Sequence, residues 1–261
     1  MKLSSQEIED LKYAKKLLEH PGLAARMTDS LASPIEKGFA MLPHKWAEIV
    51  HAATRKSIER ALKVAVKTMK SRTNSRPSNR IHKAAVMTSG ATGGAFGLIS
   101  LPIELPISTV IMLRSILDIA RSKGEDLNSP ETILNCLQIF ALGGRSDQDD
   151  ATETGYYAVR AALSKAVSDA TQHIANRGLT EQGAPVLVRL ITTIASRFGI
   201  VVSEKVAAMA IPAIGAVGGA LINTIFMDHF QSIAQGHFTI RRLERKYGAN
   251  FIEKEYKKLN D

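Results

Sequence analysis

The hexapeptide GATGGA, residues 90–95, recurs as GAVGGA at residues 215–220. Four-residue spacing places side chains on one face of a helix, and glycines at such positions let a second backbone approach closely. The repeat therefore predicts two glycine-zipper helices packed together at the centre of an all-α protein. The glycines that carry this prediction are Gly90, Gly93, Gly94, Gly97, Gly215, Gly218 and Gly219.

The glycine pattern does not fit a phosphate-binding loop. A P-loop requires a Lys followed by Ser or Thr after its last glycine, and GATGGAFG, residues 90–97, is followed by neither. The dinucleotide fingerprint requires G-x-G-x-x-G directly after a strand, and no strand pattern precedes the motif. Helix packing is therefore the favoured interpretation.

Each motif lies in a charge-free run, residues 84–103 and residues 206–227. A bilayer span requires about 20 apolar residues, so both runs are long enough. They are rich in Gly, Ala, Ser and Thr, however, and Pro102, Pro106 and Pro212 interrupt them. A buried core hairpin and a shallow membrane insertion both stay open, whereas a conventional transmembrane span is disfavoured.

The rest of the chain predicts helices throughout and one domain over residues 1–261. We divide it into N-terminal helices over 1–80 and a core over 81–248. We expect a helix from Pro43 to Lys70, others opening at Pro130 and Pro185, and a charged tail helix from Thr239 to Lys258. Cys136 is the single cysteine, which excludes an internal disulfide framework and predicts a buried structural thiol in a reducing cytoplasm. The charged N-terminus lacks the apolar segment of a secretory signal.

The net charge of +9 is concentrated in residues 55–83, which hold ten basic residues and one acidic residue. Five of these cations form a stripe along a predicted helix: Lys56, Arg60, Lys63, Lys67 and Lys70. A basic amphipathic helix suits an anionic membrane surface, although an ordinary core-facing helix with a solvated basic face has the same pattern. Nucleic acid is disfavoured as the partner, because no aromatic stacking residues interrupt the stripe. Whether the chain forms a homo-oligomer stays open.

A second hypothesis is an enzyme, or a protein that binds a metal or a small molecule, through polar residues bordering the glycine helices. Glu104 stands alone in apolar sequence. It is either a first-turn carboxylate after a possible Ser100 cap, or a buried acid with a raised pKa, or an acid paired with Arg114 or Arg121. The candidate catalytic residues are Glu104, Arg114, Asp118, Asp228 and His229. His229 and His237 are weak metal candidates, since their spacing matches no zinc motif. The sequence identifies no cofactor, and nothing in it argues for an enzyme.

Two long stretches carry a family resemblance: GATGGAFGLISLPIELPISTVIMLRSILDIARSKGEDL, residues 90–127, and IPAIGAVGGALINTIFMDHFQSIAQGHFTIRRLERKYG, residues 211–248. They resemble the bacterial EcsC protein family from about residue 83 to residue 248. The resemblance implies a cytoplasmic protein, peripheral to the inner membrane, linked to an ABC transporter or to a lipid or secretion process. It supplies no catalytic residues. Our leading hypothesis is a non-enzymatic, membrane-associated accessory protein that docks on the anionic inner leaflet.

Overall fold

Helices make up the regular structure of the chain. The computed structural model describes residues 2–19, 23, 25–27, 35–69, 100–144, 155–177, 184–211 and 215–259, and no strand occurs in these ranges. The helices are α1 (Ser5–Glu19), α3 (Ile35–Ala40), α4 (Trp46–Met69), α6 (Leu101–Ser122), α7 (Pro130–Leu142), α9 (Gly155–Arg177), α10 (Pro185–Ala210), α11 (Gly215–Tyr247) and α12 (Ala249–Lys258). The predicted all-α domain is confirmed.

Several helix boundaries follow from proline and glycine. Pro130 and Pro185 begin α7 and α10 as expected, because the missing amide hydrogen costs nothing in a first turn. The predicted tail helix from Thr239 to Lys258 was wrong. Residues from Thr239 to Tyr247 end the long helix α11, and Gly248 then turns the chain with a φ of +90° before α12 starts. Only a glycine adopts that conformation readily.

The second charge-free run is interrupted, as the position of Pro212 led us to expect. α10 ends at Ala210, and α11 begins at Gly215, so residues 206–227 do not form one helix. GAVGGA occupies the first turns of α11, at one end of this helix and not at a helix centre. Residues 90–97 lie outside the described residues. The pairing of two glycine helices therefore stays a prediction.

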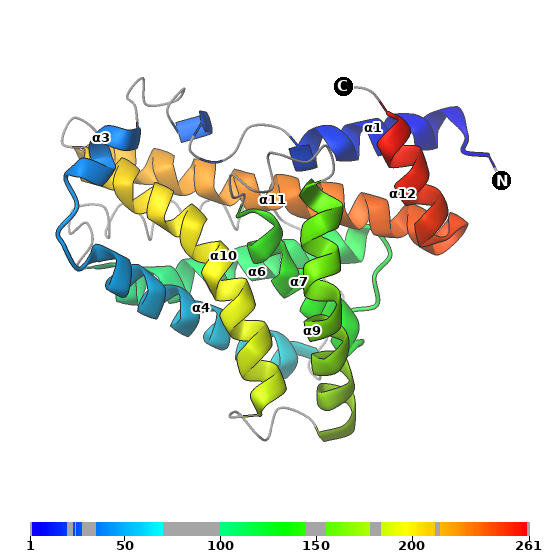
Figure 1. The fold of residues 1–261 in the computed structure, drawn as a ribbon, viewed down its shortest axis with the longest axis horizontal. Helices are drawn as coiled ribbons and strands as arrows, with labels where there is room; N and C mark the ends of the chain where they lie inside the picture. Colours follow the sequence, from blue (N-terminus) through cyan, green and yellow to red (C-terminus); the bar gives the residue numbers. More distant parts are fainter. Residues whose placement is uncertain are drawn as a thin grey trace.

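α11 is the axis of the fold. Figure 1 shows this helix along the length of the molecule, with α1 and α12 against its C-terminal half. α6 packs against α11, and α4 packs on α6 on the side away from α1. α10 contacts α3, α4, α7, α9 and α11. Among the described helices, α10 alone is long and apolar enough to cross a membrane. The core helix of a soluble protein can have the same length and composition, and α10 packs against five other helices.

Phenylalanines gather where α7, α10 and α11 meet. Phe140, Phe198, Phe226 and Phe230 are fully buried, and their neighbouring ring centroids lie 5.0 to 6.1 Å apart. Tilted and edge-on ring pairs at such distances each contribute about 1 kcal/mol beyond their buried area. Cys136 is also buried, as predicted, and burial raises the pKa of its thiol, which argues against a nucleophilic role.

Close helix contacts occur at glycines outside the repeated motif. A Cβ atom on Gly38 of α3 would lie 1.9 Å from the Ala207 carbonyl oxygen of α10. A Cβ atom on Gly236 of α11 would lie 2.7 Å from Leu18 Cγ of α1. Both contacts require the absence of a side chain, so these isolated glycines set the spacing of α3 on α10 and of α1 on α11.

Candidate functional site

A buried ion pair joins three helices near the start of α11. Lys205 Nζ of α10 lies 2.8 Å from Glu104 Oε1 of α6, and the exposed fractions of the two side chains are 0% and 5%. Asn223 Nδ2 of α11 donates a 3.2 Å hydrogen bond to the same oxygen. The Lys205 ammonium also lies 5.0 Å from the centre of the Phe226 ring, within range of a cation–π interaction.

Glu104 lies in the first turn of α6 and is buried, as predicted, but its cap and its partner differ from the prediction. The Ser100 side chain makes no cap hydrogen bond to α6, and the carboxylate pairs with Lys205, not with Arg114 or Arg121. Lys205 was not among the predicted site residues. Its helical register was an available signal, since it follows Phe198 by seven residues and Val202 by three on the buried face of α10. A cation at such a position requires a buried partner.

The other predicted catalytic residues do not join Glu104. Asp118 pairs with Arg121 at 3.9 Å, about 21 Å further along the axis of α6 at 1.5 Å per residue. Arg114 is exposed on the same helix. His229 is buried, and its Nε2 lies 2.9 Å from the Gly143 carbonyl oxygen, while Asp228 beside it is half-buried. The five candidates therefore form no single catalytic cluster.

The two candidate metal ligands are engaged separately. His229 contacts the end of α7 through Gly143, whereas His237 Nδ1 lies 2.9 Å from the hydroxyl of Tyr156 on α9. Across the described ranges, no three His, Cys, Asp or Glu side chains come together as a metal site would require.

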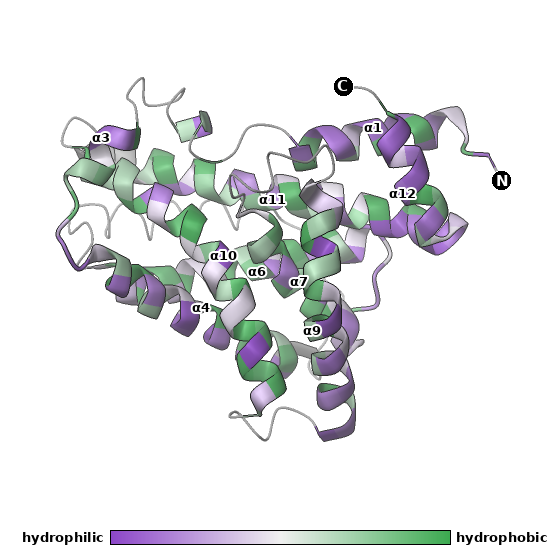
Figure 2. Cartoon of the chain, viewed as in Figure 1, coloured by the Kyte–Doolittle hydropathy of each residue, from purple (hydrophilic) through white to green (hydrophobic). Residues whose placement is uncertain are grey.

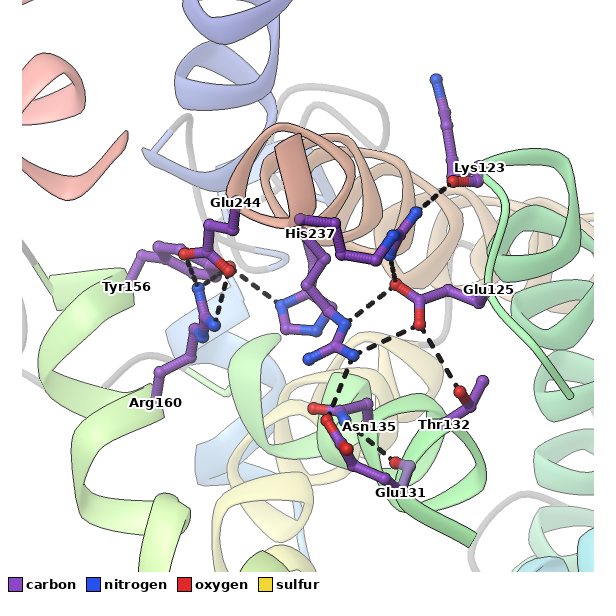
Figure 3. A network of polar contacts seen from close by, with 11 residues as sticks. Lys123, Glu125, Glu131, Thr132, Asn135, Tyr156, Arg160, His237 and Glu244 are labelled. Atoms are coloured by element: carbon purple, nitrogen blue, oxygen red, sulfur yellow. Dashed lines mark hydrogen bonds and ion pairs between the residues drawn. The ribbon is translucent and has the colours of Figure 1, made fainter. Parts of the chain in front are cut away.

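A polar network ties the C-terminal half of α11 to its neighbours (Figure 3). Arg241 Nε donates to Glu125 Oε1 at 2.9 Å, and its Nη2 donates to Glu131 Oε1 at 3.3 Å. Arg245 pairs with the same Glu125 and donates to the Lys123 carbonyl oxygen at 2.6 Å. The carboxylates raise the pKa of Arg241 against the opposing effect of burial. These contacts join α11 to the segment between α6 and α7 and to the first turn of α7.

The second part of this network joins α11 to α9. Arg160 donates two hydrogen bonds to Glu244, at 2.8 and 2.9 Å, and a third to the Tyr156 hydroxyl at 3.2 Å. The same hydroxyl lies 2.9 Å from Nδ1 of His237. Burial lowers the pKa of His237 well below 6.5, and Arg160 and Arg241 lower it further. The imidazole is therefore neutral, and the network is a structural clamp.

The predicted basic stripe forms an exposed face of α4. Lys56, Arg60, Lys63 and Lys67 are exposed, and in the described part of the chain none of them has an ion-pair partner. Lys70 lies outside the described residues. Ile58 and Leu62 on the opposite side are buried, so the predicted amphipathic helix is confirmed. Figure 2 shows hydrophilic residues recurring along the outer side of α4.

Exposed apolar side chains lie at the neighbouring end of the bundle. Ile103 and Ile107 project from one face at the start of α6, with exposed fractions of 72% and 42%. Leu221 near the start of α11 is 42% exposed. The hydrogen bond between Glu104 and Asn223 places the starts of these two helices together. α4 packs against α6, so the cationic face and the apolar end belong to adjacent helices.

One comparison with known proteins identifies a family for this chain. No match was found among curated proteins or among solved structures. A family model matches residues 5–243 of the 261-residue chain. The match includes α1, α4, the first stretch that carries the resemblance and residues 211–243 of the second stretch. The chain therefore belongs to the EcsC protein family.

Proposed function

We propose that this protein docks on an anionic membrane surface, as a non-enzymatic accessory protein of the inner leaflet. The observation that carries the proposal is the row of four exposed cations on α4, Lys56, Arg60, Lys63 and Lys67, which lack ion-pair partners among the described residues. On the same helix Arg55 pairs with Glu59 at 3.1 Å and is therefore less available to a lipid phosphate.

The charge on this face is large enough to hold a protein on a membrane. Each cation near an anionic leaflet contributes about 1 kcal/mol, so four contribute about 4 kcal/mol. The apolar end adds to this if Ile103, Ile107 and Leu221 enter the headgroup region, since burying a branched side chain contributes about 1 to 2 kcal/mol. Charge attraction and buried apolar area together set the strength of reversible binding at a membrane surface.

Nucleic acid is the competing partner for the same charge. Proteins that bind single strands stack bases on exposed aromatic rings between their cations. Trp46 is the one aromatic residue of α4, and it lies half-buried with its ring centroid 5.7 Å from that of Phe39. The cationic face therefore favours phosphates on a lipid surface over stacked bases. The link to an ABC transporter stays a prediction of the family resemblance.

Flotation with liposomes tests the proposal. The protein should float with vesicles containing phosphatidylglycerol at low salt and should remain in solution with pure phosphatidylcholine. The triple variant Lys56→Gln/Arg60→Gln/Lys63→Gln loses about 3 kcal/mol of attraction, so its partition coefficient should fall about 100-fold. High salt should have a similar effect on the unmodified protein.

A second triple variant, which removes three positive charges elsewhere on the protein, distinguishes the effect of this surface from the effect of net charge. Lys165, Arg189 and Lys254 are exposed cations on α9, α10 and α12, and none has an ion-pair partner in the described ranges. Lys165→Gln/Arg189→Gln/Lys254→Gln should float almost as the unmodified protein does. Equal losses for the two triple variants would reject α4 as the docking surface, and no flotation of the unmodified protein would reject the proposal.

A further inference from the structure

A pocket of about 370 Å³ lies between α1 and α11, on the side of the molecule away from α4 (Figure 1). This volume is at the lower end of the range for small-molecule sites. Two short stretches of α1 and α11, together with Arg26, form the lining. They contribute Tyr13, Lys16, Leu17, His229, Ser232 and Ile233.

Close contacts on both sides of the pocket hold its walls in place. At Gly236, one turn beyond Ser232, the backbone of α11 approaches Leu18 and the Ala14 carbonyl oxygen of α1. His229 is held from the other side, because its Nε2–H donates to the Gly143 carbonyl oxygen at 2.9 Å. Ligand sites are usually preformed in this way, since an ordered wall loses little entropy on binding.

The charge of the lining favours an anion. Among the described residues of the lining are two cations, Lys16 and Arg26, and no carboxylate. The other lysines of α1 show the contrast, because Lys12 pairs with Glu9 at 3.1 Å and Lys15 pairs with Glu19 at 3.6 Å. Within the described residues Lys16 and Arg26 have no such partner. Two unpaired cations facing one cavity repel each other, and an anion between them removes that repulsion.

We propose that this pocket binds a phosphate monoester. The guanidinium of Arg26 and the ammonium of Lys16 would hold the phosphate oxygens, because an arginine fork and a lysine point charge are the usual phosphate partners in proteins. The hydroxyls of Tyr13 and Ser232 can donate further hydrogen bonds. Leu17 and Ile233 provide an apolar wall for the organic part of the ligand. The phosphate could belong to a soluble metabolite or to a lipid headgroup.

Histidine NMR of the full chain, labelled with ¹⁵N, tests this proposal. Addition of glycerol 3-phosphate should shift the imidazole resonances of His229 saturably, while those of His237, which lies in the Tyr156 network, stay constant. A second titration uses dihexanoyl phosphatidic acid below its micelle concentration. Tighter binding of glycerol 3-phosphate assigns a soluble ligand, and tighter binding of the phosphatidic acid assigns a lipid headgroup.

Charge variants locate the binding site. Lys16→Gln and Arg26→Gln should each weaken binding about tenfold, the usual loss for one charge-assisted hydrogen bond, and the double variant about 100-fold. Lys12→Gln on the same helix should stay within about twofold of the unmodified protein. Circular dichroism checks that each variant is folded. No saturable shift with either phosphate compound, or binding that is unchanged in the double variant, would overturn the proposal.

Discussion

Removing the ammonium of Lys205 is expected to destabilise the fold far more than removing an exposed charge. Lys205→Met leaves the carboxylate of Glu104 buried and without its ammonium partner, while Asn223 still donates a hydrogen bond to it. Breaking a buried ion pair from one side costs about 3 to 5 kcal/mol. The free energy of unfolding of a domain is roughly 5 to 15 kcal/mol, so the variant loses a large share of its stability.

Urea titration followed by circular dichroism at 222 nm measures this loss. With an m value of about 3 kcal/mol/M, the unfolding midpoint should fall by about 1 to 1.7 M. Glu104→Gln/Lys205→Met removes both charges and keeps an oxygen that accepts from Asn223. The double variant should therefore recover about 2 kcal/mol or more relative to the sum of the two single variants.

An exposed pair provides the control. Arg55 and Glu59 lie 3.1 Å apart with exposed fractions of 50% and 40%, so Glu59→Gln should cost about 0.5 kcal/mol or less. If Lys205→Met costs no more than Glu59→Gln, solvent reaches the Glu104 carboxylate and the reasoning from burial is wrong. Strict additivity of the two single substitutions would also refute it.

Three further predictions concern the contacts of α11 with its neighbouring helices. Gly236→Ala should lower the free energy of unfolding by about 1 to 3 kcal/mol, because the new Cβ would lie 2.7 Å from Leu18 Cγ. Gly199→Ala should raise it by up to about 1 kcal/mol, because a Cβ there would lie 4.0 Å from the Thr54 hydroxyl oxygen and alanine favours the helix. Urea midpoints measure both changes. Lys246 and the other hydrogen-bond donors around Glu7 lower the pKa of that carboxyl from 4.5 to about 2, so its stabilising effect is present above pH 4.5 and is lost as the pH falls to 2. The urea midpoints of Glu7→Gln and the unmodified protein should therefore differ at pH 6 and converge by pH 2, and a constant difference would contradict this. His237 should remain neutral at pH 5 in ¹⁵N NMR spectra, because burial lowers its pKa; protonation near pH 6.5 would contradict its burial among Arg160 and Arg241.

Local sequence patterns predicted the helices well. Pro130 and Pro185 begin helices where expected, and the cations of α4 face solvent while Ile58 and Leu62 face the core. These features depend on residues within one or two turns of each other, which is the range over which a sequence pattern is informative.

Such local patterns could not predict the contacts between segments that are distant in the sequence. Glu104 and Lys205 are 101 residues apart, and the sequence offered Arg114 and Arg121 as nearer partners. Gly38 and Gly236 carry close helix contacts without any repeated motif, because the partner backbone at each position is set by the whole fold. The end of α11 was misplaced for a related reason, since Gly215 to Tyr247 changes from apolar to charged along one continuous helix.

The depth of a nitroxide label in vesicles tests membrane docking most directly. Labels are placed at Ile103→Cys, at the start of the helix α6 that packs against α4, and at Lys165→Cys on α9. The buried thiol of Cys136 should stay unlabelled. On vesicles containing phosphatidylglycerol, collisions with oxygen should rise relative to a water-soluble nickel quencher at position 103 and stay unchanged at position 165. Equal accessibility of the two labels to the nickel quencher, in protein that has bound the vesicles, would contradict docking through this end of the molecule.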